Sequence, residues 1–406
     1  MRRCAVRISG MTDLISIAEA RLRVLGEIQP LPTEAVDITS ALGRVLAEDV
    51  VAVGDVPPFA SSAMDGFAVV AGPAGRRLEI IDESRAGSPA RRGLDDRQAI
   101  RVSTGAVVPQ GATAVIRVED TKEAAGVVTI ATASAPGQNI RSAGDDLVAG
   151  GQVLDLGLTL GPSALGIAVS AGRTTVTCAQ RPRVAVLATG DELMPVGARL
   201  AAGQIHNSNA VVLAGLVEQS GAKAITSDPV ADDQTATSAA IKAALSAADV
   251  VVVTGGVSVG PHDHVKAGFA AAGIQERFWR VALRPGKPIW FGTHGSKLAF
   301  GLPGNPVSAV VCFHLFVRPA LLALQGASPI SPRLSARLAS PVKLNPTREQ
   351  ALRVCLRWES DGAVAELTGP QGSHQLSSML SADALAFIPS GEGEADVGQL
   401  VDIELL

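Results

Sequence analysis

Three glycine-rich loops carry the residues of this sequence that are best suited to chemistry. They occupy residues 188–192 (ATGDE), 254–260 (TGGVSVG) and 301–306 (GLPGNP), and each comes directly after or at the end of an apolar run. Glycine turns can present backbone N–H groups to an anion, and the polar residues beside them can hold it in place. A single loop of this kind gives weak support for a function, but three that follow neighbouring strands favour a binding site.

Charged residues accompany the second loop. Asp263 stands at the start of a helix predicted over residues 263–272, where it can cap the helix or face a ligand or a metal ion; the local sequence alone favours the cap. Arg280, Arg284 and Lys287 lie between the second and third loops. This cluster can be a solvated surface. Beside glycine loops it also suits an oxyanion or a phosphate group, because Arg280 and Arg284 share a face in a strand as well as in a helix.

Alternating strands and helices predict an α/β domain over residues 179–327. Strands are expected at residues 184–187, 223–226, 250–253 and 297–300, and helices at 209–219, 237–247, 263–272 and 306–324. The four consecutive valines at 250–253 indicate a strand buried on both faces, as in the centre of a mostly parallel sheet. Helices then cover both faces, and the three loops meet beyond the carboxyl ends of the strands, where such sheets bind ligands.

The rest of the chain predicts three smaller parts. Residues 13–50 and 145–178 form a discontinuous helical N-terminal domain, with helices expected at 13–25, 39–47 and 162–171. Residues 51–144 form an inserted β-rich domain, whose polar loops at 61–66, 103–106 and 141–146 can be simple solvated turns. Period-two stretches over residues 328–406 predict a C-terminal β-barrel-like domain.

Composition narrows the class of protein. The chain has 406 residues, 47% of them hydrophobic and 18% charged, with a formal net charge of −4. This balance argues against a nucleic-acid binder or a binder of acidic membranes. The four scattered cysteines lack CxxC or CxxH spacing, which argues against a zinc site and disulfides and favours a reducing cytoplasm. No signal-peptide pattern follows the basic N-terminus, residues up to about 12 are interpreted as a leader, and no apolar run is expected to span a bilayer.

Five motifs, in this order and spacing, resemble the molybdopterin molybdenumtransferase family, the molybdenum insertases that include the E domain of gephyrin. The motifs are residues 62–66 (SAMDG), 189–192 (TGDE), 254–260 (TGGVSVG), 284–288 (RPGKP) and 301–309 (GLPGNPVSA). The resemblance covers nearly the whole chain from about residue 13. The sequence departs from the family pattern at Ala60 and Ser61, where an Asp-Asn pair is common, at Phe67 in place of Tyr, and at Asp145 in place of Glu.

The resemblance implies an elongated homodimer of four-domain subunits, with the site between the α/β domain of one subunit and the β-rich domain of its partner. The implied reaction takes adenylylated molybdopterin and molybdate, releases AMP and leaves molybdenum on the dithiolene. It also implies contacts with a molybdopterin adenylyltransferase and with recipient molybdoenzymes.

The family motifs assign candidate roles residue by residue. The candidate catalytic residues are Asp65, Asp146, Glu192, Asp232 and Asp263, with Glu192 and Asp263 as candidate ligands of Mg²⁺. The candidate substrate-binding residues are Thr104, Thr189, Gly190, Gly255, Gly256, Ser258, Gly260, Arg280, Arg284, Lys287, Pro303, Gly304, Asn305, Pro306 and Ser373.

The chemistry of these residues agrees with the implied reaction. Splitting a phosphoanhydride between two anions requires charge neutralisation by carboxylate-bound Mg²⁺ and by Arg or Lys. No Ser-His-Asp or Cys-His set is evident, so a covalent enzyme intermediate is not expected. Two alternatives remain open: a molybdopterin adenylyltransferase, which is a single compact domain, and a non-catalytic scaffold like that of gephyrin, which could dispense with the acidic residues.

Overall fold

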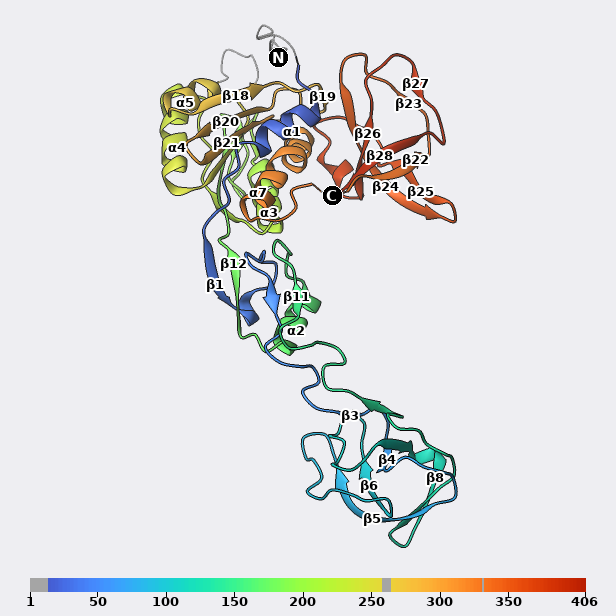
Figure 1. The fold of residues 1–406 in the computed structure, drawn as a ribbon. Coiled ribbons are helices and arrows are strands. Elements are labelled where there is room, and N and C mark those ends of the chain that lie inside the picture. Colours follow the sequence, from blue (N-terminus) through green and yellow to red (C-terminus); the bar gives the residue numbers. More distant parts are fainter. Residues whose placement is uncertain (1–13, 258–263, 331) are drawn as a thin grey trace, which may run out of the picture. The chain divides into compact units, whose positions relative to one another are not determined.

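The computed structural model describes residues 14–257, 264–330 and 332–406 (Figure 1). The described chain divides into two compact units, one made of Ala35–Cys178 and the other of the residues up to Glu34 together with Ala179–Leu406.

A mixed sheet forms the centre of the α/β domain. Its strands run in the order β16 (Lys223–Thr226), β13 (Arg183–Ala188), β17 (Val250–Thr254), β21 (Lys297–Leu302), β20 (Trp290–His294) and β18 (Gln275–Trp279). The first four strands are parallel, whereas β20 and β18 are antiparallel to their neighbours. The predicted mostly parallel sheet is confirmed. The strands β18 and β20 were not predicted, because residues 275–294 mix charged and apolar positions without a clear period.

Helices cover both faces of this sheet. Helices α4 (Gln234–Ala247) and α5 (Val265–Ala271) lie on one side, and α1 (Ile17–Leu25), α3 (Ser208–Gln219) and α7 (Arg318–Leu324) on the other (Figure 1). The side chains of β17 alternate between the two faces: Val251 and Val253 pack with α4 and α5, while Val250 and Val252 pack with the opposite helices. This alternation explains the run of four valines, since a strand covered on both sides has no polar face.

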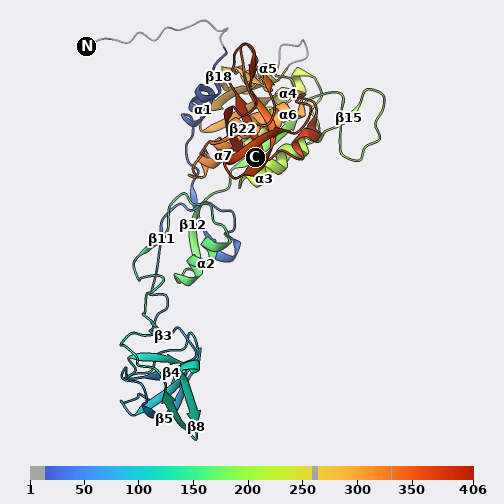
Figure 2. The same cartoon turned by 90° about the vertical axis from the view of Figure 1, so that its right-hand side faces the viewer.

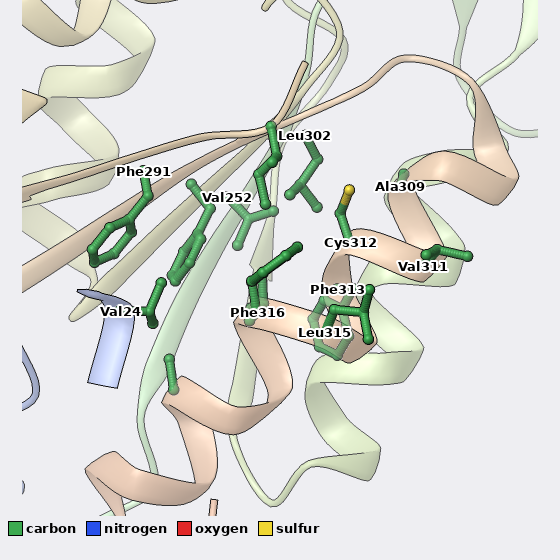
Figure 3. Close-up of a cluster of buried hydrophobic side chains, with 14 of the residues drawn as sticks. Val24, Val252, Phe291, Leu302, Ala309, Val311, Cys312, Phe313, Leu315 and Phe316 are labelled. Atoms are coloured by element: carbon green, nitrogen blue, oxygen red, sulfur yellow. The ribbon is translucent and has the colours of Figure 1, made fainter. Parts of the chain in front are cut away.

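One long apolar helix fills the larger core. It runs through α6 (Pro306–Cys312), a π-helical segment η3 (Phe313–Val317) and α7. Figure 3 shows Val252, Phe291 and Leu302 of the sheet beside Cys312 and Phe316 of this helix. Over Pro306–Leu324 the helix is long and apolar enough to cross a membrane, contrary to the expectation from sequence, but 78% of its most apolar window is buried. A core helix of the α/β domain accounts for this composition.

His314 lies in the π-helical segment with its Nδ1 atom buried and without a hydrogen-bond partner among the described residues. Burial, assisted by the nearby positive charge of Arg318, lowers the pKa of His314 from 6.5 to about 4. Protonating this ring in the folded protein therefore costs free energy that the unfolded chain does not pay.

The folded protein is therefore expected to lose stability in acid through His314. Between pH 6.5 and about 4 the unfolded chain binds the proton more readily than the folded chain, so the stabilisation is complete above pH 6.5 and is lost as the pH falls. The loss should approach about 3 kcal/mol. Denaturant unfolding at pH 7 and pH 4.5 measures it, and a His314→Gln variant should lose less stability between these two values. An equal loss in both proteins would contradict the assignment.

A closed barrel forms the C-terminal domain. Its strands are β22 (Leu334–Leu338), β24 (Glu349–Glu359), β25 (Gly362–Leu367), β26 (Ala384–Ile388) and β28 (Leu400–Leu405), and β24 closes the barrel by pairing with both β25 and β26. The predicted barrel-like domain is confirmed. The short strand β19 (Leu283–Arg284) of the α/β domain adds to β24 in parallel, which joins the two domains through main-chain hydrogen bonds.

The other compact unit contains separate cores. In the first, β2 (Val50–Val51), β11 (Gln152–Leu154), β12 (Thr175–Ala179) and α2 (Pro162–Ser170) surround Leu46, Ala168 and Cys178. β1 (Thr33–Asp37) pairs with β12. The inserted β-rich part is a sheet in the order β7 (Ala114–Arg117), β4 (Gly66–Val69), β6 (Gln98–Val102), β5 (Arg77–Ser84), β9 (Val127–Ile130) and β8 (Thr121–Ala124). Two short strands, β3 (Ser61–Ser62) and β10 (Ile140–Arg141), pair beside it.

The N-terminal segments depart from the prediction in two ways. The helix predicted at residues 39–47 is wrong: after a short 3-10 turn, Ile38–Ser40, the chain turns at Gly43 (φ 72°), and Val45 and Leu46 form β-bridges. The apolar residues that suggested a helix here are instead part of this strand pairing. The first helix, α1, packs into the α/β core and not with residues 35–50, and its buried Arg21 pairs with Glu404 of the barrel at 2.6 and 2.7 Å.

Candidate functional site

The three glycine-rich loops start at one level of the sheet. Ala188 of β13 is in register with Thr254 of β17, and Thr254 with Leu302 of β21, so the carboxyl ends of these strands coincide. The loops line one pocket of about 670 Å³ in the α/β domain. The predicted site residues in its lining are Thr189, Gly190, Glu192, Asp232, Gly255, Gly256, Pro303, Gly304, Asn305 and Pro306.

The second loop turns so tightly that only glycine fits at its start. Gly255 and Gly256 have φ angles of 93° and 60°, which side chains disfavour. A Cβ atom on Gly255 would lie 2.6 Å from the Thr189 carbonyl oxygen, and one on Gly256 would lie 2.9 Å from Cγ2 of Val265. The first and second loops can therefore pack in direct contact only because Gly255 has no side chain.

The glycine N–H groups differ in what they do. The N–H of Gly255 donates to the Leu302 carbonyl at 3.1 Å, so the expectation that both glycines present their N–H to an anion is wrong for Gly255. Among the described residues no hydrogen bond engages the N–H of Gly256. Within the described chain, Gly256 is thus the one glycine of the pair whose N–H could meet an anion.

Thr189 places a second donor at the same turn. Its side chain is 7% exposed and lies against Gly255 and Gly256, yet Oγ1 has no hydrogen-bond partner within the described chain. A buried hydroxyl without a partner costs about 1–3 kcal/mol. The oxygen atom is closed off from solvent, so a ligand oxygen would recover that cost only where binding opens the turn enough to reach it.

The acidic residues of the site divide by their contacts. Asp191 accepts a hydrogen bond from the backbone N–H of Asp232 at 3.0 Å, and Asp233 caps α4 by accepting from Ala236 at 2.8 Å. Both carboxylates hold the main chain. Glu192 and Asp232 line the pocket, and the Glu192 carboxylate lies so close over Gly190 that a Cβ there would be 2.5 Å from Oε2.

These carboxylates suit a shared cation better than a closed metal site. No group of three or more His, Cys, Asp or Glu that could hold a metal occurs in the part of the chain that the structure describes. Mg²⁺ needs oxygen ligands, keeps several waters and is often held by one or two carboxylates together with substrate phosphates. Glu192 and Asp232 fit that ligand set once a phosphate ligand is present.

Three predicted residues lie outside the described residues: Ser258, Gly260 and Asp263. Helix α5 begins at Val265, with His264 at the N-cap position and no side-chain cap hydrogen bond. The structure has the predicted helix over Val265–Ala271, and its predicted start at Asp263 lies outside the described residues.

The basic cluster is not part of the described pocket lining. Pro288 lines the pocket, whereas Arg280, Arg284 and Lys287 are absent from the described lining residues. The Arg280 guanidinium stacks on the Trp279 ring, with 3.8 Å to the centroid, and Lys266 lies 3.6 Å from the same centroid. Arg284 reaches Gln350 at 3.5 Å. The assignment of Arg280, Arg284 and Lys287 to ligand binding stays a prediction.

A loop of the barrel closes one side of the pocket. Ser373 accepts a hydrogen bond from the Asn305 side chain at 3.1 Å, and its carbonyl accepts one from the Val307 N–H at 3.0 Å. Ser373, predicted to bind substrate, thus holds the third loop, and the adjacent His374 lines the pocket.

Arg353, which was not predicted, anchors this barrel loop from within. It is fully buried and donates to the Gly372 carbonyl at 3.2 Å and to Ser378 Oγ at 3.1 Å, while its Nη1 atom has no partner among the described residues. Burial lowers its pKa to about 10. A lone charged residue inside the apolar stretch ALRVCL was the available sequence signal.

The candidate residues of the other compact unit form their own local contacts. Asp65 accepts hydrogen bonds from both the backbone N–H and the hydroxyl of Thr104, at 2.7 and 3.1 Å, so these two predicted residues are neighbours. Asp146 is exposed, and its backbone N–H donates to the Val56 carbonyl at 2.9 Å. The Asp65 carboxylate already holds a loop whether or not it meets a ligand.

Comparison with known proteins matches the whole described architecture. Family models described as "MoeA N-terminal region (domain I and II)", "Probable molybdopterin binding domain" and "MoeA C-terminal region (domain IV)" match residues 15–172, 185–323 and 335–406. The molybdopterin molybdenumtransferase of Haemophilus influenzae is 35% identical over 398 residues, covering 96% of this chain and 98% of that protein. That of Staphylococcus aureus strain MRSA252 is 32% identical, covering 96% and 95%. The crystal structure of the molybdopterin biosynthesis MoeA protein from Pyrococcus horikoshii OT3 matches with a TM-score of 0.82 and 30% identity, covering 97% of this chain and all (100%) of that one.

Proposed function

Because this chain belongs to the molybdopterin molybdenumtransferase family, transferases of molybdenum cofactor biosynthesis, we propose that its pocket binds adenylylated molybdopterin and inserts molybdenum from molybdate with Mg²⁺-dependent release of AMP. The observation that carries the proposal is the Thr189 hydroxyl, which lies against the Gly255 and Gly256 turn and has no partner among the described residues. Because this oxygen atom is closed off from solvent, a phosphate oxygen at the carboxyl ends of the parallel strands would accept its hydrogen bond once binding opens the turn slightly.

The residues of the pocket would act by positioning. The Thr189 hydroxyl and the Gly256 N–H would donate to phosphate oxygens, which fixes the phosphoanhydride against the turn. Glu192 and Asp232 would hold Mg²⁺, which when bound supplies positive charge for the departing AMP. Pro303 and Gly304 line the pocket beside the turn.

Incubation with adenylylated molybdopterin, Mg²⁺ and molybdate tests the proposal. AMP release and transfer of molybdenum to the pterin are both expected, and removing Mg²⁺ with a chelator should suppress them. Formation of adenylylated molybdopterin from ATP and molybdopterin would instead support the adenylyltransferase alternative. Ligand binding without AMP release under any of these conditions would favour a scaffold.

We also propose that the active form is a homodimer in the cytoplasm with sites shared between subunits. Asp65 and Thr104 belong to one compact unit and the glycine loops to the other, and the family resemblance implies a site that joins the two across subunits. Contacts with a molybdopterin adenylyltransferase and with recipient molybdoenzymes belong to the same proposal.

Mixing two inactive variants is expected to restore activity if sites are shared. An Asp65→Ala subunit and a Glu192→Ala subunit each damage a different side of the site, so a mixed dimer would keep one intact site and about half of the wild-type AMP release. Because random pairing makes about half of the dimers mixed, the whole sample should recover about a quarter of the wild-type rate, whereas sites confined to one subunit would recover none. Mixing after brief unfolding and refolding, with AMP release as the readout, measures this recovery. Full activity in a protein that sediments as a monomer would contradict the proposal.

A further inference from the structure

Asn209 links loops that are far apart in the sequence. It lies in the first turn of α3, and its side chain lines the pocket. Its Nδ2 atom donates to Thr254 Oγ1 at 3.0 Å and to the Gly304 carbonyl at 2.8 Å. Thr254 ends β17 and Gly304 belongs to the loop after β21, so one amide group holds the starts of the second and third loops.

The Thr254 hydroxyl completes the connection. It is buried, at 2% exposed, and donates its own hydrogen to the Pro303 carbonyl at 3.0 Å while accepting from Asn209. The direction of each bond follows from the chemistry, since a carbonyl oxygen accepts only and the hydroxyl carries one hydrogen. The carbonyls of Pro303 and Gly304 are thus both occupied by donors from the second loop and α3.

The clearance between the two loops is small. A Cβ atom on Gly304 would lie 3.5 Å from Cα of Gly255. The turn at Gly255 also rests on Thr189, whose backbone N–H donates to the Thr254 carbonyl at 3.0 Å. Any movement of the third loop would therefore change the width of the pocket beside the Thr189 hydroxyl.

We propose that Asn209 and Thr254 are positioning residues that set the separation of the second and third loops, so that the substrate's phosphate meets the Thr189 hydroxyl in the reactive geometry. Asn209 acts through Thr254 and Gly304 and need not touch the reacting atoms. That the ligand is the phosphate of adenylylated molybdopterin rests on the proposed function. The hydrogen bonds of Asn209 and Thr254 are observed independently of it.

Paired substitutions at Thr254 separate positioning from general packing. Thr254→Ser keeps the hydroxyl and should retain AMP release from adenylylated molybdopterin within about threefold, whereas the near-isosteric Thr254→Val should lower kcat/KM by about tenfold to a hundredfold. Asn209→Ala should cause a loss of similar size. Because both residues act in one connection, the double variant Asn209→Ala/Thr254→Val should lose little more than either single variant.

The matched control is Thr226→Val. Thr226 ends β16, which is separated from β17 by β13, is exposed and is not among the described residues that line the site pocket, so this change should leave kcat/KM unaltered. All assays are run below the melting temperature of each variant, so that loss of folded protein does not count as loss of activity. The wild type must release AMP for the comparison to apply, and its failure to do so would overturn the proposed function. Normal kcat/KM in folded Thr254→Val, or full additivity in the double variant, would overturn the positioning proposal itself.

Discussion

Replacing Gly255 with alanine is expected to abolish measurable AMP release. An alanine at this position would have to adopt a left-handed backbone conformation, which costs about 1–2 kcal/mol. Its Cβ atom would also collide with the Thr189 carbonyl oxygen, 2.6 Å away. The turn must then move away from the first loop, and the Thr189 hydroxyl can no longer donate its proposed hydrogen bond to the substrate's phosphate. AMP release and molybdenum transfer, measured on the folded protein, report the effect.

Gly295 provides the control for backbone strain. It has a φ of 59°, in the turn between β20 and β21, and a Cβ there would meet nothing within 4 Å. Gly295→Ala should therefore cost about 1 kcal/mol of stability without changing turnover. The Cβ atom of a Gly304→Ala variant would make an ordinary contact of 3.5 Å, so the AMP release of this variant should lie between those of Gly255→Ala and Gly295→Ala. Wild-type turnover in folded Gly255→Ala would show that the close approach of the loops is unnecessary.

The second large effect is expected at the pocket carboxylates. Glu192→Gln and Asp232→Asn keep the shape of each side chain but remove its charge, so turnover should fall about a hundredfold and the Mg²⁺ concentration needed for half-maximal rate should rise. Titrating AMP release against Mg²⁺ measures both quantities. Isothermal titration of Mg²⁺ into protein with AMP gives a readout that does not depend on turnover.

Asp228→Asn serves as the matched control for this experiment. Asp228 is exposed and lies in the same connection as Asp232, but it lines a different, smaller hollow beside α3. Asp228→Asn removes the same charge at a position close to the pocket but outside it. Comparing it with Asp232→Asn therefore distinguishes a direct contact of the carboxylate with Mg²⁺ from a long-range electrostatic effect. If Asp228→Asn shifts the Mg²⁺ requirement as much as Glu192→Gln, the carboxylates act only through net charge.

The convergence of the glycine loops could be predicted because it depends on simple rules. Four consecutive valines identified β17 as a central strand, and the alternation of strands and helices made its neighbours parallel. The register of Ala188, Thr254 and Leu302 then follows from sheet geometry, so loops widely separated in the sequence share one edge. The number of glycines in each loop would not by itself have predicted that the loops lie at the same edge of the sheet.

The side-chain contacts between loops could not be predicted. Asn209 and Gly304 are 95 residues apart, and the local sequence explains Asn209 equally well as a helix-start residue. Arg353 and Gly372 meet because β24 pairs with β25 and the chain after β25 returns past Arg353. The failed helix at 39–47 has the same cause, since the bridges of Val45 and Leu46 to Thr159 and Cys178 depend on a partner more than a hundred residues away.

The docking of Ser373 also determines which end of the pocket can attract negative charge. Helix α6 starts with Pro306, which has no N–H, and the next N–H, of Val307, is taken by the Ser373 carbonyl. One of the N–H donors that the start of such a helix would normally offer an anion is thus already used within the protein. A ligand with one charged and one neutral end should enter with its charge toward Thr189 and away from α6. The barrel thereby gives the pocket a polarity that the sheet alone would not have, and a chain lacking the barrel loop would lose this preference.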